Sequence, residues 1–398
     1  MSLFSAVEMA PRDPILGLNE QYNADTNPAK VNLGVGVYYD DNGKLPLLAC
    51  VQAAEKAMME KPAARGYLPI DGIAAYDAGV KALVFGANSE AVLSGRVATI
   101  QALGGTGGLK VGADFLKRIT PDASVLISDP SWENHRALFS SAGFPVQNYR
   151  YYNAEQRGID FDGMLADLHA AAPGSIVVLH ACCHNPTGYD ITAAQWDQVI
   201  AACKTRSLTP FLDMAYQGFG YGITEDGAVI GKFVAADVNF FVATSFSKSF
   251  SLYGERVGAL SVFCANKEEA SRVLSQLKIA IRTNYSNPPT HGAAIVTAVL
   301  GTPELRTLWE SELGAMRERI KAMRQKLVDG LKAAGIQQDM GFITRQIGMF
   351  SYSGLTKDQM VRLRQEFGVY GTDTGRMCVA ALNSKNIDYV CQSIAKVL

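Results

Sequence analysis

The middle of the chain alternates between short apolar runs and longer amphipathic segments. Between about residues 95 and 265, β-prone runs lie at 97–103, 123–129, 175–181, 208–213, 239–245 and 258–265. Segments with a helical pattern, such as 109–119 and 192–203, lie between them. Short apolar strands that alternate with helices are typical of an α/β layer architecture. We therefore expect a largely parallel sheet with helices packed on it.

The last quarter of the chain follows a different pattern. Apolar side chains recur every three or four residues at Leu305, Trp309, Leu313, Met316, Ile320, Met323, Leu327 and Leu331. This spacing predicts one long amphipathic helix, which Gly335 ends. Residues 340–398 are mixed α+β, and Thr356 with Gln359 forms a capping box before a helix at 360–367. The loop-rich first 45 residues are expected to pack with this part.

Composition narrows the class of protein. The chain has 398 residues, is 48% hydrophobic and 19% charged, and carries a net charge of −1. These values are ordinary for a soluble globular protein of about two domains, and no basic block suggests nucleic acid. There is no apolar stretch of about 18 residues for a membrane span, and the N-terminus is unlike a secretory signal. The seven scattered cysteines are expected to be reduced thiols of a cytoplasmic protein.

A glycine-rich segment follows the first expected strand. Residues 104–108 read GGTGG and precede a helix. Glycines let the backbone approach a ligand, and the N–H groups at a helix start can bind an anion. The nucleotide-binding pattern G-x-x-x-x-G-K-[ST] is absent. By itself the segment is a weak phosphate signal, and a plain tight turn is the commoner explanation.

The next four expected strands also end in polar or aromatic side chains. They are Trp132 with His135, then Asn185, then Asp213 with Tyr216, and then Ser245, Lys248 and Arg256. Each alone has an ordinary structural explanation, such as a turn or a solvated loop. In an open parallel sheet, however, ligands bind at the carboxyl ends of the strands. Pyridoxal phosphate, with a phosphate, a flat ring, a basic ring nitrogen and an electrophilic carbon, would use all of these groups.

Two histidines near the third strand end do not change this interpretation. His180 and His184 are four residues apart but follow a strand and have no carboxylate nearby in the sequence. We therefore expect no metal site.

Nine motifs in order identify a family resemblance. They are VNLGVGVY (31–38), GYLPIDG (66–72), GGTG (104–107), DPSWENH (129–135), CCHNPTG (182–188), DMAYQGF (213–219), SFSKSFSLYGERVG (245–258), RTNYSNPPTHG (282–292) and GRMCVAAL (375–382). The chain resembles the class I aminotransferases, pyridoxal-phosphate enzymes of fold type I, in their aspartate/aromatic branch. The resemblance implies a large domain with a mostly parallel seven-stranded sheet sandwiched by helices at 46–310. A smaller α+β domain would combine 1–45 with 311–398.

The resemblance implies a role for each strand-end residue. Lys248 would form the Schiff base with the cofactor and carry the proton, while Asp213, supported by His135, would pair with the ring nitrogen. The other implied cofactor contacts are Gly105, Thr106, Ser245 and Arg256 at the phosphate, Trp132 on the ring, Asn185 and Tyr216 at the phenolic oxygen, and Tyr67 from a second subunit. Lys248, Asp213 and Tyr216 are the implied catalytic residues.

The resemblance also implies how a substrate is held. Arg376 would bind its α-carboxylate, since the planar guanidinium offers a carboxylate two hydrogen bonds. Arg282 of a partner subunit would face the distal end of the substrate, and Gly36 would lie in the loop that closes over it. Trp132 and Asn185 would touch it as well. A homodimer with shared active sites follows from these roles.

The substrate is less sharply defined. Tyr39 and Leu45 resemble the aromatic subgroup, whereas Thr106 and Asn287 resemble the aspartate form. We expect transfer of the amino group of tyrosine or phenylalanine to 2-oxoglutarate, with overlapping aspartate activity. The alternative is an aspartate aminotransferase, since Arg282 suits a dicarboxylate.

Two other classes are weighed against a transaminase. A non-catalytic binding module on this fold need not keep Lys248, Asp213 and Arg376, yet all three are present. A decarboxylase or C–S lyase on the same fold would keep Lys248 but need not keep Arg282.

Overall fold

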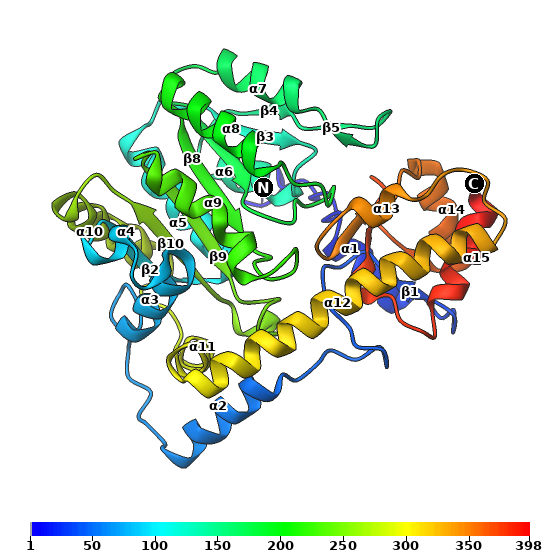
Figure 1. Cartoon of the computed structure of the whole chain (residues 1–398), viewed down its shortest axis with the longest axis horizontal. Coiled ribbons are helices and arrows are strands. Elements are labelled where there is room, and N and C mark those ends of the chain that lie inside the picture. The colour runs from blue at the N-terminus through cyan, green and yellow to red at the C-terminus, as the bar shows by residue number, and fades with distance from the viewer. Residues whose placement is uncertain (1) are drawn as a thin grey trace.

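A seven-stranded sheet forms the centre of this computed structural model, which describes residues 2–398 (Figure 1). In spatial order its strands are β2 (Val97–Leu103), β10 (Val257–Phe263), β9 (Phe240–Ser245), β8 (Thr209–Met214), β7 (Ile176–His180), β3 (Val125–Asp129) and β4 (Val146–Arg150). Only β10 runs antiparallel to its neighbours. The expected α/β fold with a mostly parallel sheet is confirmed. The alternating pattern did not indicate β4, whose sequence VQNYR is largely polar and exposed.

Apart from the edge strand β4, the strands bury both of their faces. Successive side chains point to opposite sides of a sheet, so each strand contributes to a core on either side. Phe211 packs into the core on one side and Leu212 into the core on the other. One face is covered by α5 (Gly104–Ile119), α6 (Glu133–Ser141) and α10 (Lys267–Asn284). The other is covered by α3 (Ala74–Lys81), α7 (Phe161–Ala170), α8 (Ala193–Arg206), α9 (Ile223–Ala235) and α11 (His291–Gly301). This sandwich explains why the strands are continuous apolar runs.

The predicted long helix is present as α12 (Pro303–Ala333). Its buried side chains include most of the expected apolar row, from Trp309 to Leu331. Gly335, with φ of +91°, follows its end as predicted. In Figure 1, α12 runs from the helices beside the sheet to the C-terminal part of the chain.

The two ends of the chain meet in a second, smaller body (Figure 1). Strand β1 (Val31–Asn32) pairs in parallel with β12 (Val369–Tyr370), so the expected packing of the first 45 residues is confirmed. Beside them, β11 (Phe350–Tyr352) pairs antiparallel with β13 (Arg376–Cys378). The helices here are α13 (Phe342–Arg345), α14 (Lys357–Phe367), which has the predicted capping box, and α15 (Ile387–Val397).

The remaining helices and strands complete the chain. They are α1 (Leu16–Ala24), α2 (Ala49–Glu60), α4 (Glu90–Leu93), β5 (Tyr152–Asn153), β6 (Gly158–Ile159), a π-helix at Ala82–Gly86, and 3₁₀-helices at Tyr253–Glu255 and Val379–Ala381. All seven cysteines are free and buried. No helix within residues 2–398 is long and apolar enough to cross a bilayer. The domain limits at 45 and 310 stay a prediction, and α12 passes through the second without a break.

Candidate active site

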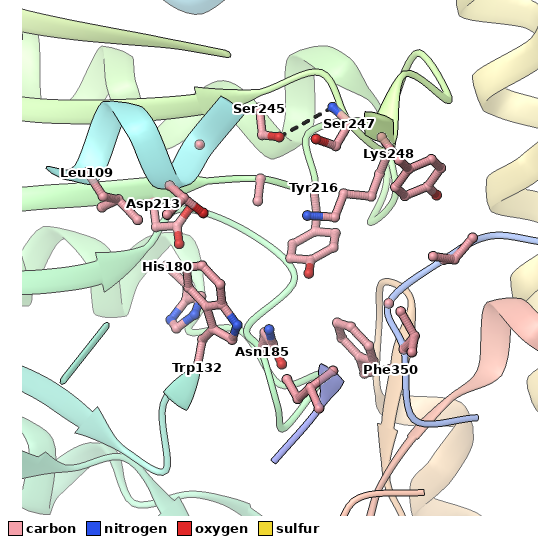
Figure 2. A pocket seen from close by; sticks show the side chains of 18 of the residues that line it. Leu109, Trp132, His180, Asn185, Asp213, Tyr216, Ser245, Ser247, Lys248 and Phe350 are labelled. Atoms are coloured by element: carbon pink, nitrogen blue, oxygen red, sulfur yellow. Dashed lines mark hydrogen bonds between the residues drawn. The ribbon is translucent and has the colours of Figure 1, made fainter. Parts of the chain in front are cut away.

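A cavity of about 320 Å³ opens at the carboxyl ends of the central strands. One wall consists of residues that follow β7, β8 and β9, and Figure 2 shows several of these side chains pointing into the same space. The opposite wall comes from both ends of the chain, through residues 35–37, Phe350 and Arg376. The cavity therefore lies between the sheet and the smaller body.

Lys248 projects into this cavity from the turn after β9. Its Nζ lies 4.8 Å from the centre of the Tyr216 ring (Figure 2). Loss of hydration lowers the pKa of the Lys248 amine to about 8, although attraction to Asp213 opposes the shift. The positive charges of Arg256 and Arg376 lower the pKa further. A substantial fraction of this amine is therefore neutral, and so nucleophilic, near physiological pH.

Asp213 is a buried carboxylate with a fixed orientation. It is 6% exposed at the end of β8, and its Oδ2 lies 2.9 Å from Nε2 of the fully buried His135. Burial would raise the pKa of the Asp213 carboxyl, but the hydrogen bond from His135 and nearby positive charge hold it below its ordinary value. Since an ionised carboxylate only accepts, Nε2 of His135 donates, and Ser131 Oγ lies 2.9 Å from the other ring nitrogen. Asp213 thus presents a lasting negative charge to the cavity.

The glycine-rich segment forms the start of α5 and part of a cup for an anion. Gly104 has φ of +70°, and a Cβ there would lie 2.7 Å from an Arg256 guanidinium nitrogen. A Cβ on Gly105 would lie 3.2 Å from Cβ of Ser245. Small residues therefore let the helix start approach Ser245 and Arg256 closely, with Thr106 beside them on the cavity wall. Helix-start N–H groups, a hydroxyl and a guanidinium together suit a phosphate.

Arg376 is a buried arginine with donors to spare. It is 1% exposed, and it donates to Asn185 Oδ1 at 3.0 Å and to the Gly34 carbonyl at 2.7 Å. Its Nε is buried without a hydrogen-bond partner. The guanidinium carbon lies 4.3 Å from the centre of the Phe350 ring. Nη1 and Nη2 each keep a second N–H, and this pair of donors suits a carboxylate that enters the cavity.

The structure brings most of the predicted site residues together. Those that line the cavity are Gly36, Gly105, Thr106, Trp132, Asn185, Asp213, Tyr216, Ser245, Lys248, Arg256 and Arg376. His135 lies directly behind Asp213, as expected. Tyr67, 97% exposed, and Arg282, also exposed, do not line the cavity of their own chain. Both were assigned to a partner subunit.

The two residues that resemble the aromatic subgroup lie elsewhere. Tyr39 is half-buried against the core, and Leu45 is 43% exposed, and neither lines the cavity. The apolar lining on that side comes instead from Ile15, Leu16, Val35, Val37 and Phe350. The sequence pattern did not reveal these five because an apolar side chain carries no chemical signature of its own.

Three polar lining residues were also not assigned a role. Ser247 belongs to the quoted lysine motif, and Tyr253 accepts a hydrogen bond from the Tyr38 N–H at 3.0 Å. His180 has both ring nitrogens buried without a partner. Burial, with the nearby histidines, holds its pKa well below the ordinary value, so the ring is neutral.

Comparison with known proteins agrees with this geometry. The family model described as aminotransferase class I and II matches residues 28–394. The chain is 63% identical over 398 residues to an aspartate aminotransferase of Pseudomonas aeruginosa. It is 49% identical over 397 residues to an aromatic-amino-acid aminotransferase of Escherichia coli. Each match covers 100% of both chains.

Solved structures agree as well. An aromatic-amino-acid aminotransferase from Burkholderia pseudomallei, covalently bound to pyridoxal phosphate, is 65% identical, with a TM-score of 0.97 over 100% of both chains. With a family model over nearly its full length, the chain belongs to the class I and II aminotransferases.

Proposed function

We propose that this protein is a pyridoxal-phosphate-dependent aminotransferase that uses aromatic amino acids, with overlapping activity on aspartate, and 2-oxoglutarate as acceptor. The observation that carries the proposal is one cavity that combines the Lys248 amine, the Asp213 carboxylate and an anion cup made by Gly105, Thr106, Ser245 and Arg256. Few ligands other than this cofactor need all three at once.

The residues present fit the cofactor. The anion cup suits its phosphate, Asp213 suits a protonated ring nitrogen, and Lys248 suits its aldehyde. Trp132 lies on the cavity wall, edge-on to His135 with ring centres 5.3 Å apart, where a flat ring can stack. When bound, the cofactor supplies an electron sink for the bond broken at the substrate Cα.

Lys248 serves as the proton carrier of the reaction in this proposal. An amine with a pKa near 8 accepts and releases a proton readily at neutral pH. The Tyr216 ring beneath Nζ limits where the amine can go. Asp213 stays ionised throughout, because His135 holds it and compensates its burial.

Arg376 and its neighbours bind and orient the α-carboxylate. The contacts to Asn185 and to the Gly34 carbonyl fix the plane of the guanidinium on the cavity wall. Gly36 packs so closely on Phe350 that a Cβ there would lie 2.7 Å from the ring. The loop at Gly36 can thus cover a bound substrate and exclude water.

The side-chain preference rests on two features. Apolar residues such as Val35 and Val37 wall the cavity, and an aromatic side chain has about 150–250 Å² of area to bury against such walls. Arg282 of a partner would pair with the distal carboxylate of 2-oxoglutarate or aspartate. Relatives of both kinds are highly similar to this chain, which supports a dual range.

A substrate panel tests the preference. We expect kcat/KM for tyrosine and phenylalanine to equal or exceed that for aspartate, with 2-oxoglutarate as acceptor. Arg282→Ala is the matched variant. It should weaken aspartate use by at least about tenfold, because a charge-assisted hydrogen bond is worth about 1.5–3 kcal/mol, while phenylalanine use falls less. A strong preference for aspartate would leave the aspartate aminotransferase alternative.

The same proposal includes a homodimer with shared sites in the cytoplasm. Its support is the exposure of Tyr67 and Arg282, together with four exposed apolar residues near the N-terminus: Leu3, Phe4, Val7 and Met9. Seven free cysteines fit a reducing compartment.

Subunit mixing tests the shared sites. Lys248→Ala and Arg282→Ala should each be poor with aspartate, but hybrids of the two carry one intact site per dimer. Activity should therefore reappear on mixing after mild dissociation. If mixing restores nothing although hybrids form, Arg282 does not act across subunits.

A further inference from the structure

Arg324 is a buried cation that none of the proposed steps uses. It lies on α12 and is 2% exposed. All of its hydrogen bonds go to backbone carbonyls, those of Ile343, Gly348 and Phe350, at 3.4, 2.8 and 2.5 Å. Burying a guanidinium among neutral partners is costly. The chain therefore retains a charged residue where an apolar helix residue would pack without that cost.

The segment that Arg324 holds adjoins the loop that carries Asn185. The Ile347 N–H donates to the Gly188 carbonyl at 2.7 Å. Gly348, with φ of +81°, packs so tightly that a Cβ there would lie 2.6 Å from Cβ of Cys183. The segment from 343 to 350 is thus fixed on one side by the Asn185 loop and on the other by Arg324.

Phe350, at the end of this segment, touches three parts of the candidate active site. Its ring lies under the guanidinium of Arg376, at 4.3 Å. It meets the Tyr216 ring edge-on, with centres 5.8 Å apart. Gly36 lies against its far edge. A small shift of the Phe350 backbone would therefore move the support of Arg376.

We propose that Arg324 is a positioning residue for substrate binding: by holding the carbonyls of Gly348 and Phe350, it keeps the Phe350 ring beneath Arg376. The inference rests on the proposed role of Arg376 in binding the α-carboxylate. A planar guanidinium can donate to three carbonyls at once through the N–H groups of its terminal nitrogens. A lysine has a single ammonium nitrogen and cannot reach three acceptors in the same arrangement.

This role has a signature that separates it from a general effect on folding. Every amino acid and oxo acid substrate has the same α-carboxylate. Disturbing Arg376 through Phe350 should therefore raise KM for aspartate and for phenylalanine by the same factor. Loss of Arg282, in contrast, should affect aspartate more.

The experiment compares Arg324→Lys, Phe350→Leu and the double variant, all as holoenzyme with sites counted by bound cofactor. KM is measured with aspartate and phenylalanine, and the Kd of succinate, a dicarboxylate that cannot react, is measured by calorimetry. We expect Arg324→Lys to raise all three by about tenfold. The double variant should fall short of the product of the single effects, because both changes act on one contact.

Arg206→Lys is the matched control. Arg206 also donates to a backbone carbonyl, that of Ala171 at 2.8 Å, but lies outside the cavity. It should leave KM and the succinate Kd unchanged. Arg376→Lys, measured beside it, tests the underlying assignment.

The outcomes are distinguishable. If Arg376→Lys weakens succinate while Arg324→Lys only lowers the unfolding temperature, Arg324 is merely structural and the inference is wrong. If Arg376→Lys leaves succinate binding unchanged, the α-carboxylate assignment and this inference both fail. Independent effects of the Arg324 and Phe350 changes would also overturn it.

Discussion

Titration of the apoenzyme tests the environment of Lys248 directly. Only the neutral amine attacks an aldehyde, so the rate at which Lys248 captures pyridoxal phosphate reports its ionisation. Burial lowers the pKa of this amine to about 8, although the negative charge of Asp213 acts to raise it. Capture should therefore become faster as the pH rises, should be half-maximal near pH 8, and should level off above that pH.

The expected size of the effect is large. With a pKa of about 8, about 10% of the Lys248 amine is neutral at about pH 7. With the ordinary lysine pKa of 10.5, about 0.03% would be neutral at about pH 7. The difference gives Lys248 about 300 times more reactive amine than a solvated lysine at the same pH.

A stopped-flow series from about pH 6 to about pH 10, which spans both pKa values, measures the absorbance change on capture. Free acetyl-lysine corrects for ionisation of the cofactor, and Lys248→Ala should show no capture. Asp213→Asn removes an attraction that raises the lysine pKa, so its plateau should begin at lower pH. A rate that keeps rising tenfold per pH unit to about pH 10 would refute a depressed Lys248 pKa.

Two further changes test the supports of the cofactor site. His135→Ala removes the hydrogen bond to Asp213, worth about 1.5–3 kcal/mol for a charged acceptor, and should weaken cofactor binding by about 10–100-fold in a fluorescence titration. An unaltered Kd would contradict the role of His135. Gly104→Ala forces a Cβ to within 2.7 Å of Arg256 at a positive φ, and should lower both the unfolding temperature and cofactor affinity. The control Gly231→Ala on α9, where a Cβ meets nothing within 4 Å, should change neither for the worse; equal losses in both variants would speak against the close packing.

The polar residues at the strand ends could be predicted from the sequence because of sheet geometry. Strands that run parallel deliver the residues after them to the same edge, so the order of strands and motifs along the chain is enough to place Lys248 and Asp213 together. The register confirms the reason, since Asp213 on β8 lies directly beside His180 on β7. The family motifs supplied the roles.

The apolar lining of the cavity could not be predicted without the tertiary structure. Phe350 and Val35 reach the cavity only because the two ends of the chain pair, and neither residue has a local pattern that reveals this. Strand β4 was missed because VQNYR has little apolar periodicity. Arg324 was hidden inside the helical row of α12, where an arginine normally faces solvent.

The pairing of β1 with β12 also sets when the enzyme can mature during synthesis. Val31 is synthesised long before its partner Val369, because most of the chain lies between them. The Leu33 N–H must likewise wait for the Tyr370 carbonyl, to which it donates at 2.7 Å. A chain whose synthesis stopped shortly before Arg376 would contain the anion cup and Lys248 but would lack the arginine proposed to bind the substrate. Translation must therefore pass Arg376 before the site is whole.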